Sequence, residues 1–272
     1  MTSWLKTGPA KKKEEDVVKP FLFETDDGGL CSQFNAYLYA MSYSVAEKAP
    51  LLVNDTANVV SLRFPLIKNT FVNPTSVTYT DTNLLSSISL KRRRQALTSY
   101  ILGLTPAHLR EAGRNILQWN EEVLQQTIDV SGIDIGVHIR TFGPNEPKNT
   151  PIDQYIKALQ TYQKNSKKTS LKVFVMSDSV QRFEEFKQKK DPKWTLVTVG
   201  TPPNLGAHSQ RDFNAAPPRQ RMAAYTEFLG ELQVMQQLPQ IICSFSSNVG
   251  KFLYLSSDAN VISVDQMAFT PF

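Results

Sequence analysis

Residues 133–141 read Ile-Asp-Ile-Gly-Val-His-Ile-Arg-Thr and combine a strand pattern with a terminal cation. Alternate positions from Ile135 to Ile139 are apolar, which predicts a β-strand, and Arg140 follows it directly. Open α/β sheets bind ligands beyond the carboxyl ends of their strands, which is where Arg140 would lie. Its guanidinium offers a planar fork of donors that suits a phosphate. The alternative is a half-buried strand that ends in a solvated arginine.

A second segment that could do chemistry is Ser-Phe-Ser-Ser-Asn at 244–248, between a strand predicted at 240–243 and a helix predicted at 247–255. Backbone N–H groups at a helix start, together with serine hydroxyls, form an anion-binding site. Ser246, Ser247 and Asn248 are therefore candidate anion-binding residues. The alternative is that the serines only cap the helix.

Glu231 is a third candidate because it lies within an apolar stripe. In the helix predicted at 219–238, it falls three or four residues from apolar neighbours such as Phe228 and Met235. A buried carboxylate without a partner costs several kcal/mol, roughly 2–7 for a neutral polar group and more for a charge. Glu231 therefore either lies at the edge of the stripe and faces water, or faces a ligand.

The paired glycines Gly28 and Gly29 precede the first long helical pattern, at 32–47, which includes Gln33. Paired glycines let a backbone approach a ligand closely, although an ordinary turn is the alternative. Asp178 lies between a strand predicted at 173–176 and a helix predicted at 180–189, within the Ser-Asp-Ser segment at 177–179 that is expected to cap the helix.

The patterns around these residues alternate between strand and helix, which predicts an α/β protein with parallel sheets covered on both faces. The predicted helices include one continuous helix at 106–126, and one that Thr150 caps, with Pro151 in its first turn. The predicted organisation is a disordered charged tail at 1–17, a Rossmann-like domain at 18–128 and a second at 129–272. A polar, proline-rich loop is expected at 200–218.

The composition restricts the class of protein. The 272 residues carry a formal net charge of +5, which suits an anionic ligand and does not by itself indicate nucleic acid. No apolar run is long enough to cross a bilayer, and no signal peptide is recognised at the start. Cys31 and Cys243 form no disulfide framework. We expect a soluble cytoplasmic protein; a lumenal location would follow only if the chain is trimmed from a longer one.

Several motifs are missing from the sequence. It has no P-loop, no nucleophile elbow, no cysteine–histidine metal spacing and no two aspartates one residue apart. We therefore expect no metal cofactor. His108 and His208 are interpreted as solvated rather than catalytic.

Three motifs resemble the fucosyltransferase superfamily, which includes α1,6-fucosyltransferases, bacterial nodulation fucosyltransferases and protein O-fucosyltransferases. Gly-Val-His-Ile-Arg at 136–140 resembles the family's His-x-Arg strand end. Glu231 stands where the family has an acidic residue, and Cys-Ser-Phe-Ser-Ser-Asn at 243–248 resembles its Thr-Phe-Ser-Ser-Gln turn. The interval from Glu231 to Ser247 matches the family's without a gap. Weaker matches are Ser-Asp at 177–178 and the glycine-rich loop at 28–33.

The resemblance implies a GT-B-like fold, in which two Rossmann-type domains hold GDP-fucose mainly through the carboxyl-terminal one. Arg140 would bind the diphosphate and act in catalysis, assisted by Ser246 and Ser247. The main chain of His138 and the carboxylate of Glu231 would bind guanine. The implied reaction is an inverting, metal-independent transfer of fucose to a hydroxyl of a glycan or protein acceptor. Nucleic acid is not an expected partner.

The sequence also departs from the family. Thr141 occupies the place of a second arginine, Gly143 and its neighbours replace an Asp-Lys pair, and Lys148 stands where α1,6 relatives have an acidic residue. The α1,6 acceptor chemistry is therefore not implied, and nearby Glu146 is the candidate general base. One alternative is a catalytically inactive relative that binds a sugar nucleotide or glycan. A weaker one is a general anion- or nucleic-acid-binding protein that uses the basic run at 91–94.

Overall fold

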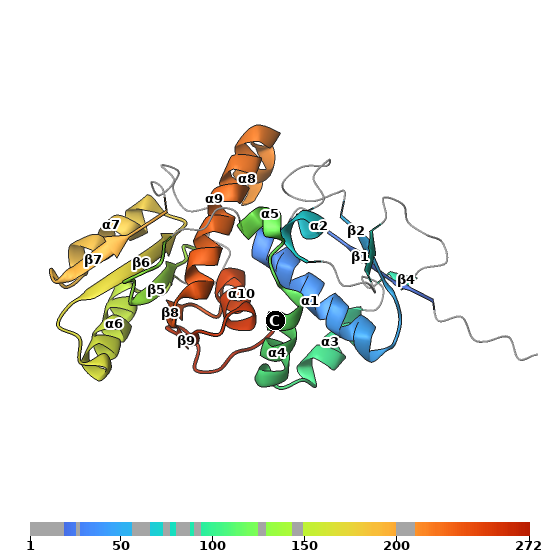
Figure 1. The fold of residues 1–272 in the computed structure, drawn as a ribbon, viewed down its shortest axis with the longest axis horizontal. Coiled ribbons are helices and arrows are strands. Elements are labelled where there is room, and N and C mark those ends of the chain that lie inside the picture. The colour runs from blue at the N-terminus through green and yellow to red at the C-terminus, as the bar shows by residue number, and fades with distance from the viewer. Residues whose placement is uncertain are drawn as a thin grey trace, which may run out of the picture.

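The structure is a computed structural model that describes residues 19–25, 28–55, 66–72, 77–79, 88–89, 94–124, 129–142, 149–199 and 210–272. It contains two parallel sheets that lie side by side along the long axis of the molecule (Figure 1). The mixed α/β class with parallel sheets is thus confirmed. The predicted tail at 1–17, together with Glu146, Lys148 and His208, lies outside the described residues.

The amino-terminal sheet has the strand order β3-β2-β1-β4, with every neighbouring pair parallel. Its strands are β1 (Phe21–Glu24), β2 (Leu51–Asn54), β3 (Val77–Tyr79) and β4 (Ile88–Ser89). The helices of this half are α1 (Leu30–Ala46), α2 (Leu66–Thr70), α3 (Arg94–Leu102), α4 (Pro106–Ile116) and α5 (Glu121–Leu124).

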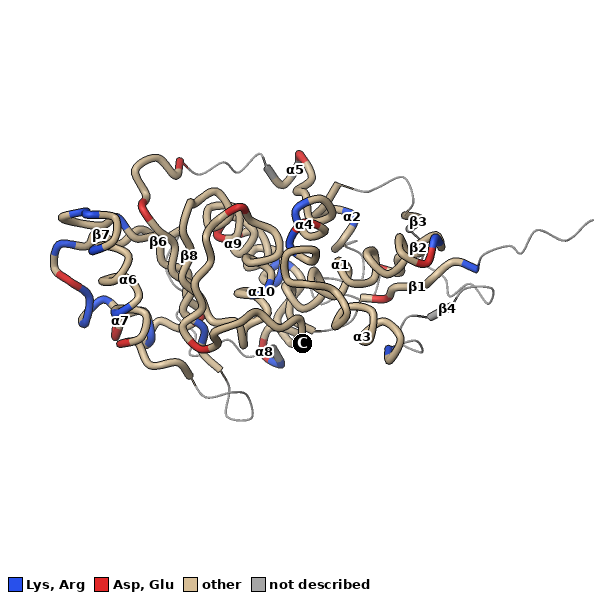
Figure 2. The backbone as a smooth tube through the Cα atoms, turned by 90° about the horizontal axis from the view of Figure 1, so that it is seen from below, with Lys and Arg blue, Asp and Glu red and all other residues tan. Residues whose placement is uncertain are grey.

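The carboxyl-terminal sheet has the order β7-β6-β5-β8-β9, and all its pairs are parallel. Its strands are β5 (Ile135–Ile139), β6 (Leu171–Ser177), β7 (Trp194–Val197), β8 (Gln240–Cys243) and β9 (Asn260–Ser263). The helices are α6 (Ile152–Ser166), α7 (Val180–Lys189), α8 (Gln210–Ala215), α9 (Pro218–Gln237) and α10 (Asn248–Ser256). Lysines and arginines gather at the outer end of this half, around α6, α7 and β7 (Figure 2).

The central strand β5 is buried on both faces, so the half-buried strand considered from its alternation is wrong. Ile135, Val137 and Ile139 join the core beneath α6 and α7. On the opposite face, a Cβ at Gly136 would lie 2.5 Å from the sulfur of Met235. Glycine at this position therefore allows α9 to pack directly on the strand that leads to Arg140.

One hydrophobic core extends across both halves of the chain. Its centre is a closed group of four aromatic rings from Phe34, Phe71, Trp119 and Phe252, with neighbouring centroids 4.9–5.9 Å apart. Because Phe34 lies on α1 and Phe252 on α10, these rings join the two halves. The domain division predicted at residue 128 stays a prediction. No helix of the described ranges is long and apolar enough to span a membrane.

Three local predictions are wrong. The helix predicted at 106–126 is broken into α4 and α5, because the backbone of residues 118–120 pairs with residues 70–72 (Val72 N–H to Gln118 O, 2.8 Å). Helix α6 begins after Pro151, without a side-chain cap from Thr150. The loop predicted at 200–218 contains α8.

Gly250, in the first turn of α10, is packed so closely against the β8–α10 turn that no larger side chain fits without a shift of the backbone. A Cβ there would lie 2.0 Å from the carbonyl oxygen of Ser244, so Gly250→Ala must displace backbone. Overpacking costs about 1–3 kcal/mol, and the gain in helix propensity returns about 1 kcal/mol. Because the clash is with backbone, we expect the cost to lie at the upper end of that range, which leaves a net loss of about 2 kcal/mol in the free energy of unfolding, measured by urea denaturation. Asn248→Ala, exposed on the same helix, is the control. Equal stability of both variants would contradict the prediction.

Candidate functional site

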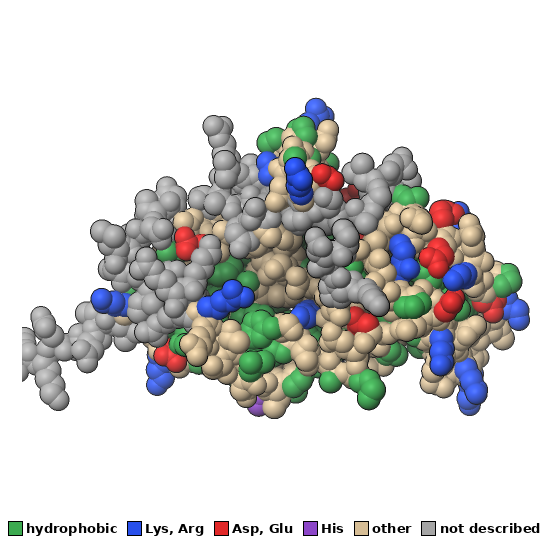
Figure 3. All heavy atoms as spheres, turned by 180° about the vertical axis from the view of Figure 1, so that it is seen from behind, with side chains coloured by type: hydrophobic (Ala, Val, Ile, Leu, Met, Phe, Trp, Pro, Cys, Tyr) green, Lys and Arg blue, Asp and Glu red, His purple; other side chains and the backbone are tan. Residues whose placement is uncertain are grey.

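The order of the carboxyl-terminal sheet creates a binding crevice. The chain winds outward in one direction from β5 to β6 and β7, and in the other from β8 to β9. Connections at such a switch point diverge, which leaves a crevice beyond the carboxyl ends of the two central strands. A cavity of about 340 Å³ lies at these ends, within the usual size range of small-molecule sites. The face in Figure 3 is hollowed near its middle, where the two halves meet.

The cavity brings together most of the predicted residues. Its walls come from the start of α1, the ends of β5 and β6, helices α8 and α9, and the β8–α10 turn. The predicted residues that line it are Gly29, His138, Arg140, Asp178, Glu231, Ser246, Ser247 and Asn248. Gly28 and Gln33 are not among the lining residues, and the Gln33 side chain is buried in α1.

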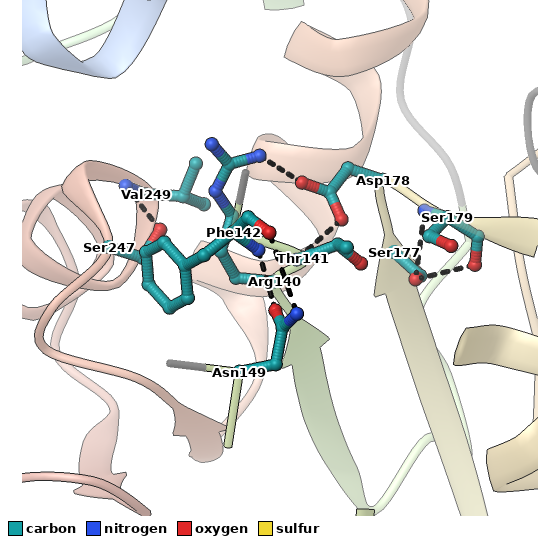
Figure 4. Close-up of polar contacts among 9 residues, drawn as sticks. All are labelled: Arg140, Thr141, Phe142, Asn149, Ser177, Asp178, Ser179, Ser247 and Val249. Carbon is teal, nitrogen blue, oxygen red and sulfur yellow. Dashed lines mark hydrogen bonds and ion pairs between the residues drawn. The ribbon is translucent and has the colours of Figure 1, made fainter. Parts of the chain in front are cut away.

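Arg140 is the one basic side chain among the described residues that line the cavity. Its guanidinium forms an ion pair with Asp178, and their side chains are only 17% and 18% exposed. Asp178 also accepts a hydrogen bond of 2.8 Å from the backbone N–H of Thr141, as Figure 4 shows. The Phe142 ring lies 5.5 Å from the guanidinium carbon. These contacts hold the guanidinium in place at the cavity wall.

His138 is buried in the cavity wall, with 2% of its surface exposed. Burial lowers the pKa of its imidazole to about 4; nearby Asp178 raises that pKa and Arg140 lowers it. Its Nδ1 has no hydrogen-bond partner within the described part of the chain. The ring is therefore neutral at pH 7 and carries no positive charge to an anionic ligand.

Glu231 was expected either to face water at the edge of its stripe or to face a ligand. The structure places it on the cavity wall, which is the position that the second alternative requires. Burial raises the pKa of its carboxyl group to about 8, and repulsion from Glu227 and Asp178 adds to this. Among the described residues, no hydrogen bond or ion pair satisfies this carboxyl group. In the ligand-free protein Glu231 is therefore mainly protonated at pH 7, and a ligand with two donors would favour its ionised form.

The serine turn between β8 and α10 caps the helix and also lines the cavity. The Ser247 hydroxyl accepts a hydrogen bond of 3.2 Å from the N–H of Val249, so the capping interpretation holds. The expectation of free backbone N–H groups is wrong at three positions. The N–H group of Ser247 donates to the carbonyl oxygen of Ser244 at 3.2 Å. The N–H groups of Phe245 and Ser246 donate to the carboxylate of Asp265, at 2.8 and 3.1 Å. The turn can thus offer a ligand its hydroxyls and Asn248, but not these three backbone amides.

Sequence reasoning missed the aromatic part of the cavity and the residue that holds the turn. Phe142, Phe213 and Phe228 line the cavity. Phe142 lies two residues after Arg140 and Phe228 shares the helical stripe with Glu231, whereas no pattern pointed to Phe213. Asp265 follows β9 closely, so the strand-end rule that identified Arg140 also applies to it. Within the described ranges, no group of three or more His, Cys, Asp or Glu side chains could hold a metal ion.

Neither a protein-family model nor a curated protein sequence matches the chain. Solved structures do match. NodZ fucosyltransferase from Bradyrhizobium aligns with a TM-score of 0.55 at 13% identity, over 93% of this chain and 98% of that one. NodZ α1,6-fucosyltransferase co-crystallised with GDP gives 0.53 at 13% identity, over 88% and 93% of the two chains. The chain has a fucosyltransferase-like fold. The GT-B-like fold expected from the three motifs is thereby supported.

Proposed function

We propose that the protein is a glycosyltransferase that moves fucose from GDP-fucose to an acceptor hydroxyl, with inversion and without a metal ion. One observation carries the proposal: Arg140, Glu231 and the serine turn, which lie far apart in sequence, converge on one cavity at the switch point of the sheet. The fold adds support, because NodZ structures with that fold were obtained with GDP and after soaking with GDP-fucose.

Each group has a role in the proposed donor complex. Arg140 and the hydroxyls of Ser246 and Ser247 bind the diphosphate, and the Glu231 carboxylate with the main chain of His138 binds guanine. The carboxyl-terminal domain, residues 129–272, holds the donor. The amino-terminal domain, 18–128, contributes the acceptor side through the loop at Gly28 and Gly29.

In the proposed reaction the acceptor oxygen attacks C1 of fucose as the bond from C1 to the β-phosphate oxygen breaks. Negative charge then moves onto the diphosphate, where the guanidinium of Arg140 stabilises it. The acceptor proton passes to a general base. Glu146 is our candidate for that base.

A second candidate function is binding of a sugar nucleotide without catalysis. It is favoured by Thr141, which stands where many fucosyltransferases have a second arginine and whose N–H binds Asp178. Calorimetry against GDP-fucose, GDP, UDP-glucose and ADP-glucose tests donor binding, and release of GDP in the presence of glycan acceptors tests turnover. Binding without release would support the second candidate. Absence of GDP or GDP-fucose binding would overturn both.

We expect turnover to survive chelation. In the proposed site, Arg140 and the two serine hydroxyls supply the positive potential that a divalent metal ion supplies in other transferases. Initial rates measured with and without EDTA, at equal ionic strength, should therefore agree within about twofold. Loss of activity in EDTA that manganese restores would show that the donor site has been misassigned.

A further inference from the structure

A second cavity lies at the opposite edge of the carboxyl-terminal sheet, where β5, β6 and β7 begin. It is an open groove of about 520 Å³, which we call the amino-edge groove. Lys172, near the start of β6, lines this groove, whereas Asp178, just beyond the end of the same strand, lines the cavity of Arg140. At about 3.3 Å per residue, the strand separates the two sites by roughly 20 Å. The groove is therefore distinct from the candidate donor site.

The walls of the amino-edge groove come from the end of α6, the connection to β6 and the start of β7. Helix α6 ends at Lys167, whose backbone has the left-handed conformation, with φ 56°. Glycine is the usual residue at such a helix end, and here a lysine takes its place. The chain then runs through Thr169 and Ser170 into β6, where Lys172 pairs in register with Thr195 of β7. Lysine and hydroxyl side chains from three elements therefore line one groove.

The acidic residues of the groove do not neutralise all of its lysines. Asp134 forms an ion pair of 2.8 Å with Lys168 and accepts a hydrogen bond of 2.7 Å from the backbone N–H of Lys172. Asp129, which lies near Lys172, accepts hydrogen bonds of 2.8 and 2.9 Å within its own turn. The exposed side chains of Lys167 and Lys172 form no ion pair with any residue in the described ranges. The groove thus keeps a positive potential, and further lysines gather on α6 and α7 beside it (Figure 2).

The remaining polar groups of the groove suit a sugar. The exposed hydroxyls of Ser170 and Thr195 form no hydrogen bond within the described part of the chain. A carboxylate has about four acceptor sites, so Asp134 can accept further hydrogen bonds. Sugar hydroxyls both donate and accept, and can therefore pair with the hydroxyls and with Asp134. The phosphates of a nucleic acid backbone or a phospholipid only accept, and would leave Asp134 without a further donor.

The side chains around the groove also argue against two other kinds of polyanion. None of the large apolar side chains that are exposed among the described residues lines it, and stable electrostatic attachment to a membrane needs such a second anchor. No aromatic side chain from these ranges lines it either, so the bases of a single strand would have no ring on which to stack.

We propose that the amino-edge groove binds an acidic oligosaccharide. Lys167 and Lys172 hold its sulfate or carboxylate groups, and its hydroxyls bind Ser170, Thr195 and Asp134. This inference does not rest on the proposed function, because none of these residues lines the cavity of Arg140. A chain bound at this edge of the sheet leaves that cavity open at the other.

The test is calorimetry with three oligosaccharides of equal chain length, namely sulfated dextran, oligogalacturonate and neutral dextran. The wild-type protein should bind both anionic chains, and neutral dextran at least about tenfold more weakly. The tighter of the two anionic chains identifies sulfate or carboxylate as the preferred group. Lys167→Ala combined with Lys172→Ala should weaken binding about tenfold or more and make it less sensitive to salt. Ser170→Ala combined with Thr195→Val should weaken it about threefold at unchanged salt sensitivity, because no charge is lost.

Lys157→Ala combined with Lys187→Ala is the matched control, because it removes two exposed lysines from α6 and α7 outside the groove. Its affinity should stay within about twofold of the wild type. Equal losses in the two lysine variants would overturn the inference, since the attraction would then be diffuse. So would the absence of oligosaccharide binding, or tighter binding to phosphatidylglycerol vesicles or to a single-stranded oligonucleotide. GDP affinity should be the same in all these variants, so failure of this inference and failure of the proposed function are separate results.

Discussion

Arg140→Ala is expected to reduce turnover of GDP-fucose by about two orders of magnitude or more. As the bond to fucose breaks, negative charge develops on the leaving diphosphate. A guanidinium already fixed by Asp178 and Phe142 stabilises that charge without reorganising. Because the interaction strengthens as charge develops, kcat should fall more than GDP affinity.

Arg140→Lys should recover little of the lost activity, because an ammonium group cannot offer two parallel donors to one phosphate. The measurements are kcat and KM for GDP-fucose, with GDP affinity by calorimetry. Arg114→Ala is the matched control, since this arginine pairs with Asp258 on the surface, where its side chain is 43% exposed. An Arg140→Ala variant with wild-type turnover would remove Arg140 from the proposed mechanism.

Elements whose ends are set by local chemistry were predictable from the sequence. Helix α7 spans the predicted residues 180–189, and it begins there because Ser179 caps it by accepting from the N–H of Arg182. Strand β8 also matches its predicted bounds, as a fully buried strand between Pro239 and Ser244. In both cases the signal lies within a few residues of the boundary.

Elements whose ends depend on distant partners were not predictable. The pattern at 106–126 is helical throughout, but residues 118–120 pair with residues 70–72 at the carboxyl end of α2. Trp119 then packs against Phe71 and Phe252, contacts that no local pattern contains. Tertiary contacts thus overrode helix propensity at this point.

The same distinction holds for the site. Arg140 and the serine turn were predictable because a strand end has a fixed place in a parallel sheet. The sequence could not show that Asp265 accepts hydrogen bonds from the N–H groups of Phe245 and Ser246. These contacts span about twenty residues and depend on how β9 pairs with β8. Likewise, the raised pKa of Glu231 arises first from burial and then from repulsion by Glu227 and Asp178, and both the burial and the approach of Asp178 depend on the tertiary fold.

The identity of the base is expected to depend on Glu231. Guanine presents two adjacent donors, N1–H and the exocyclic amine, which one carboxylate can accept together. Uracil offers a single donor on that edge, and adenine places an acceptor where N1–H would be. GDP should therefore bind more tightly than UDP and ADP by about 1–3 kcal/mol. Glu231→Ala should reduce this preference more than it weakens diphosphate binding, and Glu231→Gln should weaken GDP because its amide turns a donor toward a donor.

The pKa of Glu231 gives this prediction a pH dependence. The free protein holds the carboxyl group protonated below a pKa of about 8, whereas paired guanine donors require the carboxylate. Binding therefore releases a proton, and GDP affinity should rise by up to about tenfold per pH unit as pH increases toward 8, then level off. Above pH 7 the terminal phosphate of GDP, with a pKa of about 6, is already ionised and contributes little to this slope.

Calorimetry at about pH 7, in two buffers of different ionisation enthalpy, measures the released proton directly. The wild-type protein should release nearly one proton with GDP, whereas Glu231→Gln should release none, because the amide does not titrate. Glu227→Gln is the matched control: this exposed glutamate lines the same cavity, and its removal lessens the repulsion that raises the pKa of Glu231, so proton release should decrease but persist. Equal affinities for GDP, UDP and ADP, without proton release and unchanged in Glu231→Gln, would show that Glu231 does not select the base.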